Sequence, residues 1–484
     1  MSIRKNVVYN TLLTISNVAF PVITAPYVSR VLGVENIGTV NFVITYVLYF
    51  TLFAALGIPV YGIREIAKNK DSFENRSQIF SELFLVNVIS TFVVLLIYFI
   101  TIFSIPTLVN NRDLLLISGV AILLVPFNIE WFFSGMEKFK LIAIRSILIR
   151  IISLCGLFIF VRSRNDLIAY IALNTVVNVS SHVWLFGYMA LKKEVKFLFR
   201  GINIKKHMKP VMILFASNVA VSIYTILDTL MLGFMSDNTQ VGYYTSAMKI
   251  SKMILPVVTA LSPVMIARIS NLKAGANDNG KIMELLNRSF EFMLIVALPV
   301  TIGLICISPR FVPFFFGDEF IPATVSMQIL SSVVLIIGIS NLFGKQILVA
   351  MGEESRFFKA ILFGTITSVS LNLLLIGRFG SLGASISAVI AEIVVMITTI
   401  LFSLRVISVR IKIKGIVQPL LAALPIIPIS LYFGDVLKND FLYLSVTTIT
   451  SGVLYFVLMI YVFHNEWGNQ FIGTIMQKIK SNKN

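Results

Sequence analysis

The chain alternates between long apolar stretches and short polar interruptions, most of which carry lysine or arginine. A helix needs roughly 20 consecutive apolar residues to cross the hydrocarbon core of a bilayer. Counted in this way, the pattern contains about fourteen such stretches. It therefore predicts an all-α polytopic membrane protein with about fourteen transmembrane helices.

The composition lies outside the range of soluble proteins, because 57% of the residues are hydrophobic and only 13% are charged, with a mean hydropathy of +0.90. The net charge of +17 would favour nucleic acid as the partner of a soluble protein. Here the cations stand in short clusters between apolar runs, which is typical of loops that face anionic lipid. We therefore expect contact with membrane lipids and no binding of nucleic acid.

The polar interruptions are too short to form a soluble catalytic, nucleotide-binding or receptor domain, and they contain no glycine-rich phosphate loop. Cys155 and Cys306 both fall inside apolar stretches without further ligands nearby, so we expect packing residues there and no metal site. No cofactor is expected either.

The distribution of basic residues indicates the orientation in the membrane. With an even number of helices, about 29 lysines and arginines fall on the side of the N-terminus and about 7 on the opposite side. Because cytoplasmic loops carry the excess of basic residues, we expect both termini in the cytoplasm.

A weak internal repeat divides the chain. The first hairpin reads Arg30-Val-Leu-Gly33 in one half and Met231-Leu-Gly233 in the other, and the fourth helix of each half ends in Ser134-Gly-Met-Glu137 and Ala350-Met-Gly-Glu353. Paired halves are common in transporters, where they rock about a central site. The repeat predicts a first lobe at 1–206, a second at 207–410, and two additional helices with a tail at 411–484.

Polar residues recur on one face of the first helix of each half. Asn10 and Asn17 share such a face in the first lobe, and Asn218 belongs to the corresponding face in the second. Each of them alone is explained by hydrogen bonds between helices. Because the first helix of each half carries a matching polar face, we expect these two faces to form opposing walls of a central cavity.

Ionisable residues inside apolar stretches need a reason to be there, because each costs about 2.5–3.5 kcal/mol at a helix centre. Asp228 and Lys249 fall at similar predicted depths, so either they neutralise each other or they bind a ligand. Arg150 and Lys252 have no evident acidic partner at a matching depth. We expect these cations to attract an anionic substrate that carries phosphate, while Glu392 is a further buried charge.

Three stretches carry a resemblance to a known family: Arg30–Asn41, Asn128–Glu137, and Asp228–Met231 followed by Val241–Lys249. The chain resembles the Wzx-type polysaccharide flippases of the multidrug/oligosaccharidyl-lipid/polysaccharide exporter superfamily over nearly its whole length. The element around Trp131 is the most specific of the three, although Ser134 stands where glutamine is commoner.

The resemblance implies two pseudo-symmetric six-helix lobes around a cationic cavity, with two further helices beside them. It implies a substrate as well, an undecaprenyl-pyrophosphate-linked oligosaccharide that is moved from the cytoplasmic to the outer leaflet of the bacterial cytoplasmic membrane. No covalent bond changes in that process, so the chain would not be an enzyme. Other polysaccharide assembly proteins are implied as further partners.

Within the matched stretches, Arg30 and Lys249 are candidate cavity residues and Asp228 is a candidate coupling residue. The energy source stays open between a cation gradient acting through Asp228 or Glu392 and the membrane potential acting on a charged substrate.

Competing functions make different demands on the chain. A cation-coupled drug antiporter of the same fold would favour acidic groups in the cavity, whereas a basic excess is expected here. A membrane glycosyltransferase or polymerase would need a sizeable outer loop with catalytic carboxylates. The function of a channel or scaffold would leave the buried charges in two pseudo-symmetric halves unexplained.

Overall fold

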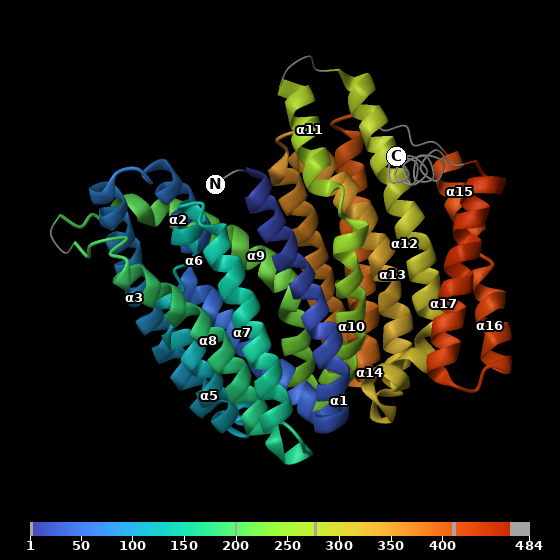
Figure 1. Cartoon of the computed structure of the whole chain (residues 1–484), viewed down its shortest axis with the longest axis horizontal. Helices are drawn as coiled ribbons and strands as arrows, with labels where there is room; N and C mark the ends of the chain where they lie inside the picture. The colour runs from blue at the N-terminus through green and yellow to red at the C-terminus, as the bar shows by residue number, and fades with distance from the viewer. Residues whose placement is uncertain (1–2, 199–200, 275–277, 409–412, 465–484) are drawn as a thin grey trace, which may run out of the picture. The chain divides into compact units, whose positions relative to one another are not determined.

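The computed structural model describes residues 3–198, 201–274, 278–408 and 413–464, and gives the backbone alone for residues 3–19 and for positions 217, 220, 221, 223–225, 274 and 279. All regular elements of this described part are helices (Figure 1). The elements up to residue 235 are α1 (Ile3–Ala55), α2 (Ile58–Lys68), α3 (Phe73–Ser104), α4 (Pro106–Val109), α5 (Arg112–Leu123), η1 (Val125–Phe127), α6 (Glu130–Gly135), α7 (Phe139–Phe160), η2 (Arg164–Asp166), α8 (Leu167–Leu191) and α9 (Lys205–Met235). Those that follow are α10 (Asn238–Val258), α11 (Ser262–Ala274), α12 (Asn279–Phe316), η3 (Asp318–Phe320), α13 (Ala323–Asn341), η4 (Leu342–Val349), α14 (Glu354–Leu404), α15 (Lys414–Ala423), α16 (Ile426–Val436), α17 (Asp440–Val457) and η5 (Leu458–Val462).

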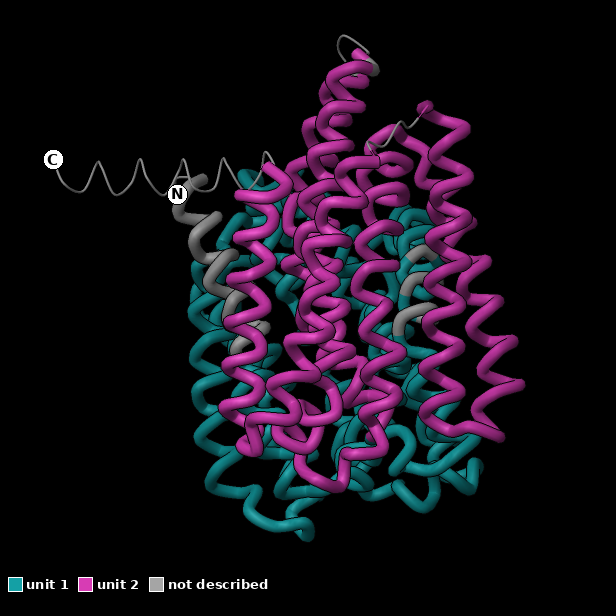
Figure 2. Tube along the Cα trace, turned by 90° about the vertical axis from the view of Figure 1, so that its right-hand side faces the viewer, with its two compact units in different colours: residues 1–242 teal, residues 243–484 magenta. Residues whose placement is uncertain are grey.

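The chain forms two compact units, residues 1–242 and 243–484 (Figure 2). The division comes later than the lobe boundary expected at residue 206, because α9 contacts α1 and α2 and clusters with unit 1. The lobe boundaries at 206 and 410, which refer to a sequence repeat, stay a prediction.

Two of the longest helices are broken by glycine. Gly33 in α1 has φ 77° and Gly380 in α14 has φ 53°, a backbone region that residues with a Cβ avoid. In α14 the chain folds back on itself, since the Ser387 hydroxyl donates to the Ser368 carbonyl over 3.1 Å. Along one straight helix these residues would be roughly 28 Å apart.

The membrane character of the fold is confirmed. By length and composition, ten helices in the described part of the chain can cross a membrane, or eleven if the bent pair Asn238–Val258 and Ser262–Lys273 makes one crossing. This count takes Phe20–Ala55 and Glu354–Leu404 as single helices, although each is broken at a glycine with non-helical backbone angles. The number of fourteen crossings therefore stays a prediction.

The apolar side chains point both inward and outward. In unit 1, Phe80 stacks on Trp131 with ring centroids 5.7 Å apart, inside a cluster that also buries Phe132 and Phe133. Large apolar side chains are exposed on the outer face of α3, where Phe92 is 63% exposed. A helix with apolar residues on all sides is expected where lipid replaces water.

Two turns paired by the sequence repeat share one backbone geometry. Glu137, between α6 and α7, has φ 57°, and Gly352, between η4 and α14, has φ 77°. Directly after each of them an amide reaches back five residues, from Lys138 to the Phe133 carbonyl over 2.9 Å and from Glu353 to the Leu348 carbonyl over 2.8 Å. This is the Schellman closure of a helix. Glu137 therefore corresponds to Gly352, one residue away from the pairing by sequence letters.

Candidate functional site

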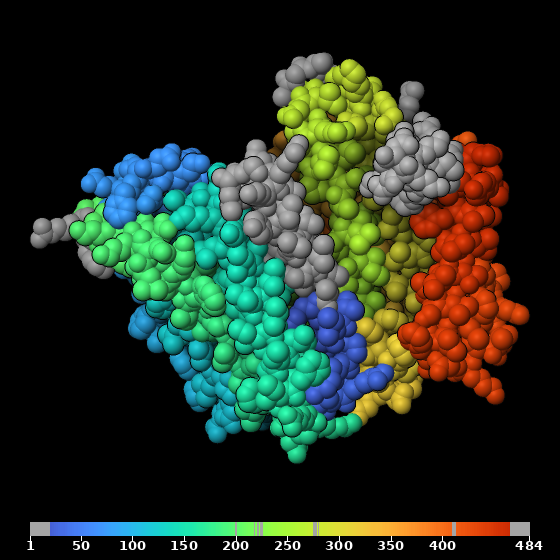
Figure 3. All heavy atoms as spheres, in the orientation of Figure 1, coloured from blue at the N-terminus to red at the C-terminus, as the bar shows by residue number. Residues whose placement is uncertain are grey.

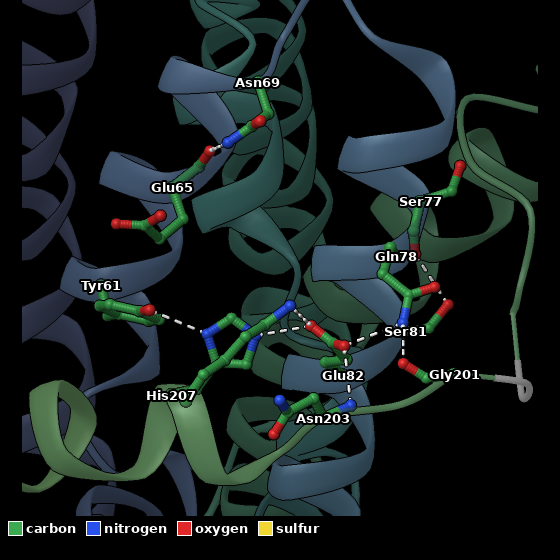
Figure 4. Close-up of polar contacts among 11 residues, drawn as sticks. Tyr61, Glu65, Asn69, Ser77, Gln78, Ser81, Glu82, Gly201, Asn203 and His207 are labelled. Carbon is green, nitrogen blue, oxygen red and sulfur yellow. Dashed lines mark hydrogen bonds and ion pairs between the residues drawn. The ribbon is translucent and has the colours of Figure 1, made fainter.

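A buried carboxylate organises the end of unit 1 at which α3 begins. Glu82 of α3 is fully buried, and each of its carboxylate oxygens accepts two contacts (Figure 4). Oε1 accepts from the Gln78 side chain over 2.8 Å and from the Asn203 amide over 2.9 Å. Oε2 lies 2.8 Å from Lys206 Nζ and 2.7 Å from His207 Nε2. We call Tyr61, Gln78, Glu82, Asn203, Lys206 and His207 the Glu82 cluster.

His207 joins this carboxylate to a third helix. Its Nδ1 lies 2.8 Å from the Tyr61 hydroxyl of α2, and both side chains are buried. Burial, and then the charge of Glu65, raises the pKa of Tyr61, so the hydroxyl keeps its proton and can donate it to Nδ1. In the tautomer that accepts at Nδ1, Nε2–H donates to Glu82.

The serines of α3 hold the segment that leads to α9. Ser77 Oγ accepts from the Lys196 amide over 3.0 Å, and Ser81 Oγ accepts from the Leu198 amide over 2.9 Å. Arg76 Nε donates to the Glu194 carbonyl over 3.1 Å. With the Glu82 cluster, these bonds tie residues 194–198 and 203–207 to α3.

The glycines of the family-like stretches allow backbones to approach closely. A Cβ on Gly38 would lie 1.6 Å from the Asn238 carbonyl oxygen, and one on Gly242 would lie 2.3 Å from the Val34 carbonyl oxygen. A Cβ on Gly233 would meet the ring of Phe42 at 2.2 Å. The second half of α1 therefore packs against α9 and the start of α10 only if these positions lack a side chain.

The predicted site residues of unit 1 differ in burial. Asp228 of α9 is buried, and so is the Tyr49 hydroxyl in the second half of α1. Arg150 and Asn218 are half-buried, and Arg30 is exposed. The side chains of Asn10 and Asn17 lie outside the described residues.

In unit 2, Lys249 and Lys252 are exposed on α10 and Glu392 is half-buried on α14. Between the two lysines, Ser251 is buried and donates to the Leu330 carbonyl over 3.0 Å. The lysines therefore occupy a different face of α10 from the one that packs on α13. The pairing of Asp228 with Lys249, which joins residues of different units, stays a prediction, as does the central cavity.

Residues 3–273 match the profile of the family described as "Polysaccharide biosynthesis protein". The chain belongs to the polysaccharide biosynthesis protein family. The resemblance read from the three sequence stretches is thereby confirmed. The matched region of the family contains the candidates Arg30, Arg150, Lys249 and Lys252.

One relative of this family member is matched over nearly its full length. The "Putative O-antigen transporter" of Escherichia coli (strain K12) is 26% identical over 83% of this chain and 97% of that protein. Among solved structures, "Lipid II flippase MurJ, inward closed conformation" gives a TM-score of 0.75 at 16% identity, covering 95% of this chain and 99% of that one. An inward-facing multidrug resistance MATE family transporter gives 0.62 at 15% identity, covering 82% and 94%.

Sequence reasoning missed the Glu82 cluster in this family member. The available signal was the one-face spacing of Ser77, Ser81 and Gln78 beside an acidic residue near the start of an apolar stretch. Its partners, Asn203 to His207, lie about 120 residues further along the chain. Only the folded chain brings them together.

Proposed function

We propose that the protein is a flippase that moves an undecaprenyl-pyrophosphate-linked oligosaccharide from the cytoplasmic to the outer leaflet by alternating access, for the synthesis of a surface polysaccharide. The observation that carries this proposal is the similarity to a protein named as an O-antigen transporter over 97% of that protein's length. The match to the polysaccharide biosynthesis family and the fold of a lipid II flippase support it.

The charges of the chain fit such a substrate. A pyrophosphate is held best by arginine and lysine, which donate charge-assisted hydrogen bonds to its oxygens. We assign this role to Arg30, Arg150, Lys249 and Lys252. The amides Asn10, Asn17 and Asn218 would bind sugar hydroxyls, since an amide both donates and accepts.

Coupling to a cation gradient would need a charge whose state changes during transport, whereas a membrane potential would act on the charged substrate itself. We assign this role to Asp228, which is buried, and to Glu392, which is half-buried. Two lobes, 1–206 and 207–410, would alternate about the central site while 411–484 lies beside them. Both termini would face the cytoplasm, and polysaccharide assembly proteins would receive the product at the outer leaflet.

The alternative is a cation-coupled drug antiporter of the same fold. The likeness to the multidrug transporter has a lower TM-score than the likeness to the lipid II flippase, 0.62 against 0.75. The family match and the O-antigen relative also favour the flippase.

The proposal is tested by deleting the gene and analysing the membrane lipids. We expect a lipid-linked oligosaccharide to accumulate with its sugar on the cytoplasmic side, and complementation by the intact gene to clear it. Arg150→Gln, made in a protein that is still inserted at normal levels, should complement poorly. Accumulation of soluble nucleotide sugars without the lipid intermediate would contradict the proposal.

A further inference from the structure

A cavity of about 520 Å³ lies where α6, α7 and α8 meet in unit 1, within the size range of ligand sites. Its charged lining is Glu137, Lys138 and Lys140, and its apolar wall includes Leu141 and Ile144. We call it the α7 pocket. None of the candidate transport residues lines it.

The charges of this pocket leave one cation unmatched. Glu137 pairs with Lys70 over 3.5 Å, and Lys138 pairs with Glu194. Lys140 is exposed and makes no hydrogen bond or ion pair within the described part of the chain. The pocket therefore carries an excess positive charge at the position of Lys140.

The positive charge of Lys140 lies at the N-terminal end of α7, where it destabilises the helix. Lys138 caps the N-terminus of α7 and Lys140 lies in its first turn, which has no acidic residue. The positive end of a helix dipole disfavours cations and favours anions. At the matching turn of unit 2, α14 begins with Glu354 in its first turn after Glu353, as the dipole requires. The two turns share one backbone geometry and differ in charge.

An apolar track leads away from the pocket along α7. Ile144, Leu148, Ile151 and Ile152 follow one another at spacings that place them on one helical face, and all four are exposed, Ile152 by 63%. Figure 3 shows α7 (turquoise) on the surface of unit 1. Tyr188 borders the pocket, as expected for an aromatic residue at a membrane interface.

We propose that the α7 pocket binds the phosphate of an anionic glycerophospholipid, with Lys140 and the first turn of α7 contacting the phosphate and the acyl chains lying along the exposed face of α7. The pocket lies on the side of the membrane that the basic residues assign to the cytoplasm. This site goes beyond the proposed transport function and does not depend on it.

The test is a titration of the purified full-length protein with phosphatidylglycerol or phosphatidylcholine, with bound lipids counted by native mass spectrometry. We expect phosphatidylglycerol to bind more tightly, and Lys140→Gln to weaken this binding about fivefold, since one basic residue near a membrane surface contributes about that factor. Because Lys140 has no protein partner among the described residues, its replacement leaves the fold intact.

The matched control is Lys359→Gln, which removes an exposed lysine near the start of α14 and should leave binding of phosphatidylglycerol unchanged. Equal weakening by both variants would mean a non-specific charge effect and would overturn the site. Equal binding of both lipids would overturn it as well.

A competition experiment distinguishes a glycerophospholipid from a polyprenyl lipid as the ligand of the α7 pocket. Undecaprenyl phosphate, added at the same concentration as phosphatidylglycerol, should leave most of the bound phosphatidylglycerol in place. If it displaces phosphatidylglycerol from the protein but not from Lys140→Gln, the pocket belongs to the polyprenyl lipid and the assignment to a glycerophospholipid is wrong.

Discussion

Two charged regions lie at the same end of unit 1 and differ in how their charges are satisfied. In the Glu82 cluster a fully buried carboxylate accepts four contacts. In the α7 pocket Lys140 is exposed and makes no hydrogen bond or ion pair within the described part of the chain. Glu194 links α3 to the α7 pocket, because its carbonyl accepts from Arg76 and its carboxylate pairs with Lys138. A charge that protein groups saturate has a structural role, whereas an unmatched charge beside a cavity marks a ligand site.

The largest effect is expected at the centre of the Glu82 cluster. Glu82→Leu removes the shared acceptor and leaves Lys206, the Asn203 amide and the Gln78 side chain without it. Breaking a buried charge pair by removing one partner costs about 3–5 kcal/mol, so the midpoint of thermal unfolding in detergent should fall sharply. Glu74→Gln, on the exposed first turn of the same helix, is the control and should change little. Equal melting of the two variants would contradict a structural role.

A second prediction compares the effect of an added methyl group on stability at two glycines, one in tight packing beside the Glu82 cluster and one on the open surface beside the α7 pocket. A Cβ on Gly62 would lie 2.3 Å from the Trp131 ring, whereas one on Gly187 would meet nothing within 4 Å. Gly62→Ala should destabilise the protein by about 1–3 kcal/mol through overpacking. Gly187→Ala should be neutral or slightly stabilising because alanine favours a helix. Chemical denaturation of both variants measures the difference, and a neutral Gly62→Ala would argue against tight packing there.

A smaller effect concerns the hydroxyl that completes the cluster. Tyr61→Phe leaves His207 Nδ1 buried without a donor and should cost about 1 kcal/mol. Tyr432→Phe, at an exposed position on α16, is the matched control and should melt like the unmodified protein. If both substitutions leave the midpoint unchanged, the Tyr61 contact contributes nothing to stability.

The smallest effect has the opposite sign. In a neutral detergent without anionic lipid, Lys140→Glu should stabilise the protein by about 0.3–1 kcal/mol, because it places an anion at the positive end of α7. Glu354→Lys, in the first turn of α14, should destabilise it by a similar amount. Lys140→Glu should bind phosphatidylglycerol weakly at the same time. A loss of stability in Lys140→Glu would mean that the lysine is already satisfied within the protein.

The sequence predicted the class of fold well, because the alternation of apolar and basic segments follows directly from the requirements of a bilayer. The family was equally accessible, since its motifs around Gly33, Trp131 and Gly242 are local. The Glu82 cluster could not be predicted, because its two parts lie about 120 residues apart in the chain. The breaks at Gly33 and Gly380 could have been suspected from glycine alone, but many other glycines in this chain lie within regular helix.

The predicted transport residues form an intermediate case. Their presence in apolar stretches was visible in the sequence. Asp228 is buried, and because burying a charge costs free energy, this position agrees with the functional role expected for it. Whether Arg150, Lys249 and Lys252 converge depends on how helices far apart in the chain are arranged, which hydrophobic periodicity does not encode. Their role therefore stays a prediction that rests on charge and chemistry.

The most direct test of the flippase proposal is reconstitution of the purified protein into liposomes that contain an undecaprenyl-pyrophosphate-linked oligosaccharide on the inner leaflet. A membrane-impermeant oxidant outside the vesicles reports the sugars that reach the outer leaflet. We predict that the protein makes this fraction rise with time and that Arg150→Gln slows the rise. An identical time course in liposomes with and without the protein would contradict the account.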